Sequence, residues 1–354
     1  MRLRHALGLT VAATTALLGL SVPAVAGPAA QLRTSLDPRT SVLKPGERVQ
    51  VLAFDDNSLL NGGAHYGLGV WARFSSLGAA GQPFSDKTVS STAIGATTDG
   101  TVHNVVAAGS RVFIADRRMT DGRWFPWGEI TSAGAAGPLP GTPQQVAVAA
   151  MGRKLHVLAL VDGKVHQATG DWNTGTWSGW GDVSSATGLP TGIRIAAAVT
   201  GNSLHVVSLG LDDEIYVADG DYDRGTWRVG EPTALLGQPS AGVIGELSAA
   251  AIGSKLHIVA EADDRLYQAT GDYAAGSWVG WGDLTAATGQ VGPLGWVDRL
   301  AVAAVGNKLH LYTLSGRGMY NATGDYDRGT WSGWGNVTQA VDAPGLSDLA
   351  VTAA

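Results

Sequence analysis

The sequence predicts an all-β protein, a six-bladed β-propeller with four-stranded antiparallel blades, and three observations support this prediction. The stretch ATGDYDRGTWSGW at residues 322–334 recurs along the chain with small changes. Its first tryptophan recurs at intervals of 53, 53, 50, 51 and 53 residues, a period typical of propeller blades. Each period also contains short β-prone runs separated by turn residues. The six tryptophan anchors are Trp71, Trp124, Trp177, Trp227, Trp278 and Trp331.

One period shows the strands clearly. Residues 146–183 contain VAVAAMG, KLHVLALVDG, KVHQATGD and TWSGWGDV, and we expect these runs to form one antiparallel blade of four strands. A glycine stands two residues before each anchor, as at Gly175 and Gly329. A turn that requires a positive φ explains this glycine.

The two ends of the chain are expected to form one blade together. The run from Glu47 to Phe54 already has the pattern of a second strand, so the N-terminal repeat lacks an innermost strand. The missing pattern appears at residues 349–354. A blade built from both ends closes the ring and leaves no open sheet edge. Seven blades would need a degenerate blade within residues 27–45, which are too few and too punctuated by proline.

The N-terminus has the pattern of a secretory signal peptide. Arg2 and Arg4 precede an apolar run at residues 6–22, and the small residues Ala24-Val25-Ala26 precede Gly27. The run is interrupted by threonine and short for a membrane span, which favours cleavage over anchoring. We therefore expect a signal peptide at residues 1–26, a lead segment at 27–45 and the propeller at 46–354. The mature protein should be secreted and extracellular, with no membrane insertion.

Composition excludes several classes of function. Without residues 1–26, which contain two arginines and no acidic residue, the formal charge is 22 − 30 = −8. This negative charge disfavours nucleic acid as a partner. The chain has no cysteine, so disulfides, thiolate metal sites and a cysteine nucleophile are excluded.

Two sets of repeated polar residues are interpreted as structural. Histidines recur on the second strands, and each belongs to a different blade, too far from the others to share a metal ion. We expect them to be hydrogen-bonded between blades, and we expect no metal and no cofactor. Acids also recur after the second aromatic residue of each repeat. The histidines are His103, His156, His205, His257 and His310, and the acids are Glu129, Asp182, Glu231 and Asp283.

The repeated turn before each anchor supplies the first set of candidate binding residues. An acid beside a flat aromatic ring suits a sugar, because the ring faces C–H groups while the charge takes hydroxyl groups. The alternative is that aspartate caps the turn and the ring packs on the next blade, and the sequence leaves both open. One repeat has Arg118 and Met119 instead. The candidates are Asp171/Trp172, Asp221/Tyr222, Asp272/Tyr273, Asp325/Tyr326 and Tyr66.

A second aromatic residue stands three positions after most anchors. On a regular strand this side chain would face away from the anchor, unless the intervening Ser-Gly forms a bulge. Gly230 replaces it in one repeat, so that blade does not need it, which fits a binding site better than a core. The candidates are Trp180, Trp281 and Trp334.

The WSGW units, as at Trp177 to Trp180 and Trp331 to Trp334, follow a G-x-[LV]-[YH]-x-A strand. Together these motifs resemble those of bacterial β-propeller lectins that bind fucose and related sugars. The resemblance covers five of the six repeats and implies several quasi-equivalent glycan sites between blades, with aromatic residues beneath the sugar. Those lectins commonly have seven blades, whereas six is better known from fungal fucose-binding propellers and from sialidases.

Three functions are compatible with these features. We expect a secreted multivalent lectin that binds glycans or glycoconjugates, and not an enzyme. A sialidase-like propeller glycoside hydrolase is less well supported, because no pair of non-repeated carboxyl groups stands out for cleavage. The turn DRGTW is similar to the sialidase Asp-box, but its spacing differs. A scaffold for protein partners would explain the repeats without using the recurring acid and aromatic ring. The oligomeric state is not predicted.

Overall fold

A computed structural model describes residues 47–55, 58–66, 70–77, 82–84, 88–230, 235–240, 242–292 and 295–354. All of them belong to one compact unit, residues 32–354. The expected signal peptide at residues 1–26 and lead segment at 27–45 lie outside the described residues. Among the helices of the described part, none is long and apolar enough to cross a membrane.

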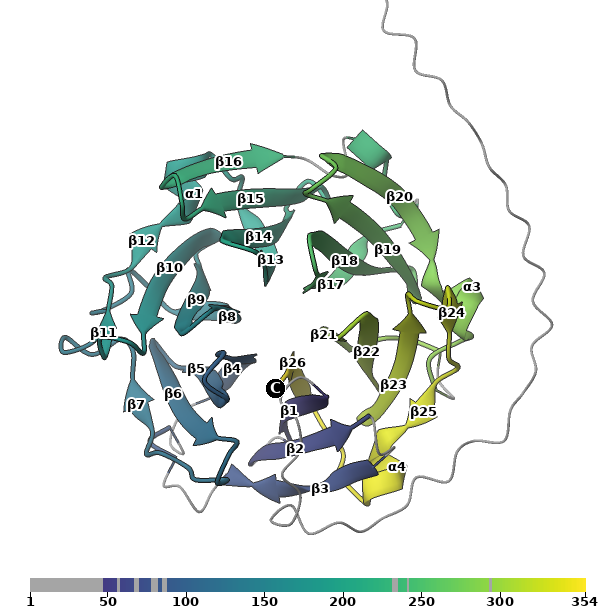
Figure 1. Cartoon of the computed structure of the whole chain (residues 1–354), viewed down its shortest axis with the longest axis horizontal. Helices are drawn as coiled ribbons and strands as arrows, with labels where there is room; N and C mark the ends of the chain where they lie inside the picture. Colours follow the sequence, from purple (N-terminus) through teal and green to yellow (C-terminus); the bar gives the residue numbers. More distant parts are fainter. Residues whose placement is uncertain are drawn as a thin grey trace, which may run out of the picture. The chain divides into compact units, whose positions relative to one another are not determined.

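Six antiparallel sheets surround a central axis (Figure 1). We number the blades 1 to 6 along the chain and call the contact between neighbours junction 1/2, 2/3 and so on. The strands of blades 1 to 3 are β26 (Asp348–Ala353), β1 (Arg48–Phe54), β2 (Leu59–His65), β3 (Val70–Ser76); β4 (Val89–Ala96), β5 (Thr101–Ala108), β6 (Arg111–Arg118), β7 (Gly128–Glu129); β8 (Pro143–Met151), β9 (Lys154–Val161), β10 (Lys164–Asp171), β11 (Thr176–Trp177), β12 (Gly181–Asp182). Those of blades 4 to 6 are β13 (Gly192–Thr200), β14 (Ser203–Gly210), β15 (Ile215–Asp221), β16 (Thr226–Gly230); β17 (Ile244–Ile252), β18 (Lys255–Ala262), β19 (Arg265–Asp272), β20 (Ser277–Asp283); β21 (Arg299–Val305), β22 (Lys308–Ser315), β23 (Gly318–Asp325), β24 (Thr330–Trp331), β25 (Gly335–Asn336).

The predicted fold class and ring closure are confirmed. The C-terminal strand β26 pairs with β1, with Val351 opposite Val51, and becomes the innermost strand of blade 1. The C-terminus consequently lies near the axis, beside β1 (Figure 1). The strands β1 and β26 are thus held in one sheet, and β1 has a partner on its inner side.

Among the described residues, three short helices follow the outer strands of blades 3, 5 and 6. They are α1 (Val183–Thr187), α3 (Leu284–Thr288) and α4 (Val337–Val341). Each begins after a capping side chain, and Asp182 Oδ1 accepts a hydrogen bond of 2.8 Å from the backbone N–H of Ser185. Asp283 and Asn336 cap the other two helices in the same way. The structural interpretation of the repeated acids is confirmed at Asp182 and Asp283, while Glu231 lies outside the described residues.

The outer strand is interrupted at the Ser-Gly of the WSGW motif. In blades 3 and 6 it splits into two short strands, and in blade 5 the register shifts between Gln268 and Thr270. This irregularity brings both tryptophans of a motif to the same face, where Trp278 and Trp281 pack on one cluster of core residues from blades 4 and 5. The bulge alternative considered for this motif is confirmed.

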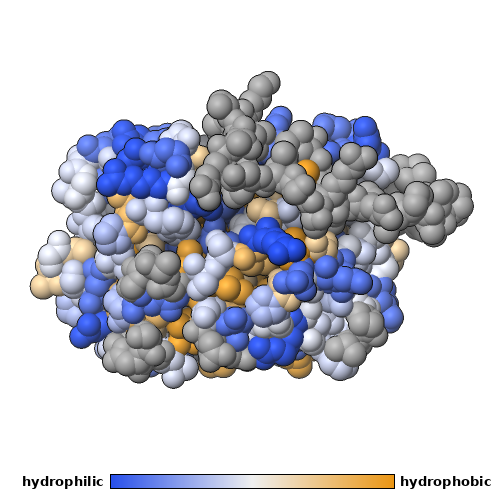
Figure 2. Space-filling model, turned by 90° about the horizontal axis from the view of Figure 1, so that it is seen from below, coloured by the Kyte–Doolittle hydropathy of each residue, from blue (hydrophilic) through white to orange (hydrophobic). Residues whose placement is uncertain are grey.

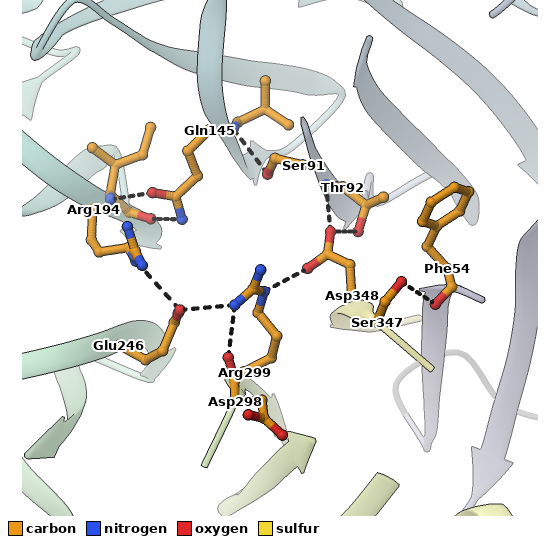
Figure 3. Close-up of polar contacts among 12 residues, drawn as sticks. Phe54, Ser91, Thr92, Gln145, Arg194, Glu246, Asp298, Arg299, Ser347 and Asp348 are labelled. Carbon is orange, nitrogen blue, oxygen red and sulfur yellow. Dashed lines mark hydrogen bonds and ion pairs between the residues drawn. The ribbon is translucent and has the colours of Figure 1, made fainter. Parts of the chain in front are cut away.

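A ring of side chains connects the six innermost strands near their first residues (Figure 3). We call this ring the axial girdle. Asp348 accepts hydrogen bonds from Thr92 N (3.0 Å) and Oγ1 (2.9 Å) of blade 2, and its other oxygen faces Arg299 Nε of blade 6 at 3.4 Å. Arg194 and Arg299 both pair with Glu246, at 3.3 and 3.4 Å. Bonds between side chains and the backbone complete the ring. The backbone N–H of Val146 donates to Ser91 Oγ, and Gln145 donates to Ile195 O and accepts from Ile195 N.

Candidate functional site

A histidine from one blade contacts an aromatic ring from the next blade at five of the six junctions. The histidine comes from the second strand and is almost fully buried. The ring belongs to the turn between the third and fourth strands. The pairs and their centroid distances are His103–Trp172 (4.2 Å), His156–Tyr222 (4.6 Å), His205–Tyr273 (4.1 Å), His257–Tyr326 (4.8 Å) and His310–Tyr66 (3.8 Å). The prediction that these histidines are wedged between blades is confirmed.

The aspartates of the same turns cap the backbone. Asp221 Oδ1 accepts hydrogen bonds from the N–H groups of Asp223 and Arg224, both at 3.0 Å. Asp171, Asp272 and Asp325 do the same in their own turns. These backbone bonds lower the pKa of Asp221 below its usual value, as they do for Asp171 and Asp272.

Both contacts of the structural alternative are therefore present in these turns, and a role in glycan binding remains a prediction. The turns differ in how much ring surface they leave accessible. Tyr222 and Tyr326 are exposed at 38% and 36%, whereas Trp172, Tyr273 and Tyr66 are covered further by their neighbours.

The second tryptophans reach back to the loop that follows the preceding blade. Trp180 Nε1 donates to the carbonyl of Gly137 at 3.0 Å, and Trp281 Nε1 donates to that of Gly237 at 2.9 Å. Trp334 donates to Gly289 O at 3.0 Å. All three are half-buried, so they tie neighbouring blades together and keep part of each ring on the surface.

The five stacked junctions are of two kinds. In the carboxylate junctions, 2/3 and 4/5, an aspartate on the third strand bonds the histidine. At junction 4/5, His205 Nδ1 lies 2.6 Å from Asp219 Oδ1 and His205 Nε2 lies 2.7 Å from Thr200 Oγ1. Tyr273 donates its hydroxyl hydrogen to Asp219 at 2.8 Å. Junction 2/3 repeats this arrangement with Asp116, Thr97 and Trp172.

In the amide junctions, 3/4, 5/6 and 6/1, a threonine replaces this aspartate, and Gln167, Gln268 or Asn321 stands two residues earlier. Gln167 Nε2 donates to Tyr222 Oη at 2.8 Å and to His156 Nδ1 at 3.0 Å. Nε2 of His156 is buried and has no hydrogen-bond partner among the described residues, and the same holds for His257 and His310. Burial lowers the pKa of His156 and His257 to about 4 and that of His310 to about 3.

Junction 4/5 also carries an open groove, with a volume of about 460 Å³. Arg228 lies directly opposite Asp219 on the neighbouring strand, and Arg228 Nε donates to Asp219 Oδ2 at 3.1 Å. Tyr273 and Trp278 line the groove from blade 5. Gly230, at the sequence position of the second tryptophan of other repeats, also lines the groove, beside Val229.

Two of the residues that line the groove, Asp272 and Tyr273, are candidates from the sequence, and their role in glycan binding remains a prediction. Gly230, where one repeat lacks the second aromatic residue, lines it as well. Asp219 and Arg228 were missed. Both residues could have been found as departures from the repeat. Asp219 lies in ADGD, where blades 3, 5 and 6 have ATGD, and Arg228 lies in TWRVG, where blades 3 and 6 have TWSGW.

No family model matches the chain, and no curated protein matches it. Solved structures with a similar fold include the six-bladed fungal lectin of Aleuria aurantia, described as having a novel fucose recognition mode. It has a TM-score of 0.57 and 15% identity over 86% of this chain and 93% of that chain. An arginine-to-alanine mutant of AofleA from Arthrobotrys oligospora has a TM-score of 0.61 and 11% identity, over 88% of this chain and 87% of that chain.

A structure of a nidogen/laminin complex is also similar, with a lower TM-score. Its TM-score is 0.51 and its identity 12%, over 86% of this chain and 98% of that chain. A sugar-recognising lectin and a protein complex therefore share this architecture. At such identities the likeness establishes the six-bladed β-propeller fold, and function must be argued from the groove itself.

Proposed function

We propose that the protein is a carbohydrate-binding protein, a lectin, whose principal site is the groove at junction 4/5. The observation that carries this proposal is the pairing of aromatic surface from Tyr273 and Trp278 with the Asp219–Arg228 ion pair in one open groove. A sugar presents C–H groups on one face and hydroxyl groups at its edge, so it can use both surfaces at once. The fold shared with the Aleuria aurantia lectin supports the same function.

The ion pair is suited to hydroxyl groups. Asp219 is largely buried and already accepts bonds from His205, Tyr273 and Arg228, which hold it in place. The Arg228 side chain is 74% exposed, so its remaining N–H groups face solvent and a ligand. A rigid carboxylate beside a mobile guanidinium offers an acceptor and donors to neighbouring hydroxyl groups of one sugar.

Binding without catalysis is the better-supported form of this function. Glycoside cleavage usually needs one carboxyl group held protonated as a general acid beside a second carboxylate. The second acid of the groove is Asp272, whose pKa is lowered by hydrogen bonds from the backbone of its own turn. Asp272 is therefore poorly prepared to donate a proton.

Secretion and multivalency belong to the proposal. The N-terminal pattern at residues 1–26 supports export. Tyr222 and Tyr326, which keep ring surface exposed beside capped aspartates, are proposed as weaker secondary sites. Each shallow site gains little free energy because sugar hydroxyls already bond well to water. Several sites on one rigid ring can nevertheless hold a glycan-coated surface through effective concentration.

A glycan array with the purified protein, followed by calorimetry with the best neutral sugar, tests the proposal. Arg228→Ser introduces the serine that blades 3 and 6 carry at this position, as at Ser178 and Ser332, so the fold should be kept. We expect it to weaken binding at least ten-fold. Arg224→Ser removes another exposed arginine of blade 4, paired with Asp221 in the turn, and should leave binding unchanged. Equal affinity in wild type and Arg228→Ser, or no sugar bound at all, would contradict the proposal.

A further inference from the structure

The stretch between the third and fourth strands of blade 2 differs in charge from its counterparts. Residues 117–125, which we call the basic turn, contain three arginines and one aspartate, a formal charge of 3 − 1 = +2. The equivalent stretches 170–178, 271–279 and 324–332 each have one more acid than base, and 220–228 is neutral. The basic turn is therefore a local reversal in a chain whose formal charge is −6.

Two aromatic rings of the basic turn hold the three arginine side chains. The guanidinium carbon of Arg117 is 5.4 Å from the centre of the Trp124 ring. The guanidinium carbons of Arg118 and Arg123 are 5.3 and 5.2 Å from the centre of the Phe125 ring. Such cation–π contacts fix the place of each charge and leave N–H donors for other partners.

Only part of this positive charge is compensated. Asp121 Oδ2 lies 3.2 Å from Arg118 Nη1, and Asp121 Oδ1 accepts a bond of 3.1 Å from the backbone N–H of Arg123. Among the described residues, no carboxylate pairs with the guanidinium group of Arg123 or of Arg117, and Arg117 donates to the neutral Asn61 Oδ1 at 2.9 Å. Arg118 and Arg123 share one ring, so an external anion would offset the repulsion between them.

The basic turn is accessible from solvent. The Arg118 side chain is 42% exposed, Arg123 is exposed and Arg117 is half-buried. The edge of the ring around blade 1, next to blade 2, shows large hydrophilic areas with apolar residues between them (Figure 2). A ligand can therefore approach the arginines along an open surface.

A polyanion fits this surface better than a small anion does. A single exposed ion pair contributes little in water, so a small anion would be held weakly. A chain with several anionic groups can contact two or three arginines at once and gains from effective concentration. Single-stranded nucleic acid is disfavoured, because its bases bind by stacking on aromatic faces, and arginines already lie over both rings.

We propose that the basic turn binds acidic polysaccharides, whose sulfate or carboxylate groups accept hydrogen bonds from Arg118 and Arg123, with Arg117 as a third, partly buried cation. The site lies on blade 2 and is separate from the groove at junction 4/5, where Arg228 pairs with Asp219. It goes beyond the neutral-sugar function, because it depends on charge and not on exposed aromatic surface. Either site can fail while the other holds.

The first test measures binding of the purified protein to polysaccharides immobilised on a biosensor. Dextran sulfate and alginate supply sulfate and carboxylate groups, and dextran is the neutral control. We expect at least one acidic polymer to bind at least about ten-fold more tightly than dextran, with an affinity that falls as salt rises. No preference for either acidic polymer would overturn the proposal. Equally tight binding of single-stranded DNA would assign the surface to any polyanion and overturn the choice of polysaccharide.

Two double variants with the same change in net charge locate the site. Arg118→Ser with Arg123→Thr removes both cations over Phe125, and blades 3, 4 and 6 have threonine at the position of Arg123. Arg224→Ser with Arg328→Ser removes two exposed arginines from the equivalent turns of blades 4 and 6. We expect the first variant to bind the acidic polymer at least about ten-fold more weakly and the second to stay within about two-fold of wild type. Equal losses would show that net charge alone matters and would overturn the proposal.

Circular dichroism checks that each variant is folded. Arg123→Thr alone changes one exposed side chain to the residue of the repeat, so it provides a second variant that should keep the fold and still weaken binding about three-fold. Binding of a neutral sugar at junction 4/5 should be the same in wild type and in all variants of the basic turn. Wild-type affinity for the acidic polymer in the folded variants would overturn the proposal.

Discussion

Junctions 4/5 and 3/4 share one geometry and differ in the side chains that complete it. In both, a buried histidine contacts a tyrosine of the next blade. At junction 4/5 the histidine has a partner at each nitrogen, Asp219 and Thr200. At junction 3/4 the equivalent positions are Thr169 and Met151, and Nε2 of His156 has no partner among the described residues.

The difference shows that the junction residues vary as a set. An aspartate on the third strand is accompanied by a threonine on the inner strand and an apolar residue two positions before the aspartate. A threonine on the third strand is accompanied by an apolar inner residue and an amide. A lone exchange would leave a buried group without a partner, which costs about 1–3 kcal/mol. Of the two carboxylate junctions, 4/5 bears the open groove, and there the Asp219 carboxylate also pairs with Arg228.

We expect the largest effect from a truncation that opens the ring, because every junction depends on ring closure. A chain ending at Ser347 loses β26 and the Asp348 contacts to blades 2 and 6. We expect it to lose more than about 4 kcal/mol of unfolding free energy, because a buried strand edge and its apolar side chains become exposed. Thermal unfolding followed by circular dichroism measures this, and an unchanged melting temperature would show that the ring does not depend on β26.

The amide junctions should respond to acid through their neutral histidines. The pKa of His156 is about 4 in the folded protein, against about 6.5 when unfolded. Between pH 4 and 6.5 the unfolded chain binds more protons at this histidine than the folded protein does. The contribution of His156 to the unfolding free energy is therefore complete above pH 6.5 and falls as the pH drops towards 4. Each such histidine contributes a slope of at most about 1.4 kcal/mol per pH unit.

Urea unfolding between pH 4.5 and 7 measures this slope, with His257→Asn for comparison. Glu246 and Asp348 have pKa values raised by burial and oppose the effect, so the difference between wild type and variant is the relevant quantity. The variant should have the shallower slope. Identical slopes, or a His257 ring protonated at pH 5.5 by NMR, would show that the amide junction does not keep its histidine neutral.

Removing one tyrosine hydroxyl group from each kind of junction should lower the unfolding free energy by different amounts. We expect this difference to be smaller than the effects described above. Tyr273 donates to the Asp219 carboxylate, whereas Tyr222 accepts from a neutral amide. A hydrogen bond to a charged group contributes about 1.5–3 kcal/mol and a neutral one about 1 kcal/mol. Tyr273→Phe should therefore destabilise more than Tyr222→Phe in chemical denaturation. Equal losses would mean that the carboxylate adds nothing to the stack.

We expect the smallest effect on stability from two substitutions that introduce a histidine–aromatic stack at junction 1/2, where the other junctions have one. Gln50→His and Met119→Tyr together install the pair found at the other junctions. We expect a favourable coupling energy of about 1 kcal/mol in a double-mutant cycle, since aromatic pairs contribute about 0.5–1.5 kcal/mol beyond burial. No coupling between the two substitutions would show that the introduced rings do not stack at this junction.

The sequence predicted the fold because a propeller repeats its hydrophobic pattern and its turns. The number of tryptophan anchors predicted the number of blades, and the pattern at residues 349–354 predicted the closing strand. The helices after Asp182, Asp283 and Asn336 were missed because five residues are too few to show a helical period.

The candidate site was predicted less completely, and the reason lies in what repetition can reveal. The turn aspartates and aromatic rings were found because they recur in the repeats. The contact of each ring with the histidine of the preceding blade was not found, because it depends on how neighbouring blades pack and no local sequence pattern records this packing. Asp219 and Arg228 form a pair only through strand register, nine residues apart. Such departures from the repeat, with Arg117 as another example, are the positions to examine first in a repeat protein.

The axial girdle determines when in its synthesis the protein can be completed. Asp348, which holds blade 1 to its neighbours on both sides, lies 300 residues after Arg48, the first residue of β1. While the nascent chain emerges, β1 lacks its inner partner, so its edge stays unpaired until β26 has been translated, after the strands of the other five blades. The C-terminus then lies near the axis (Figure 1). A purification tag or fusion partner at this end would therefore leave the ring from beside its centre, next to the residues that close it.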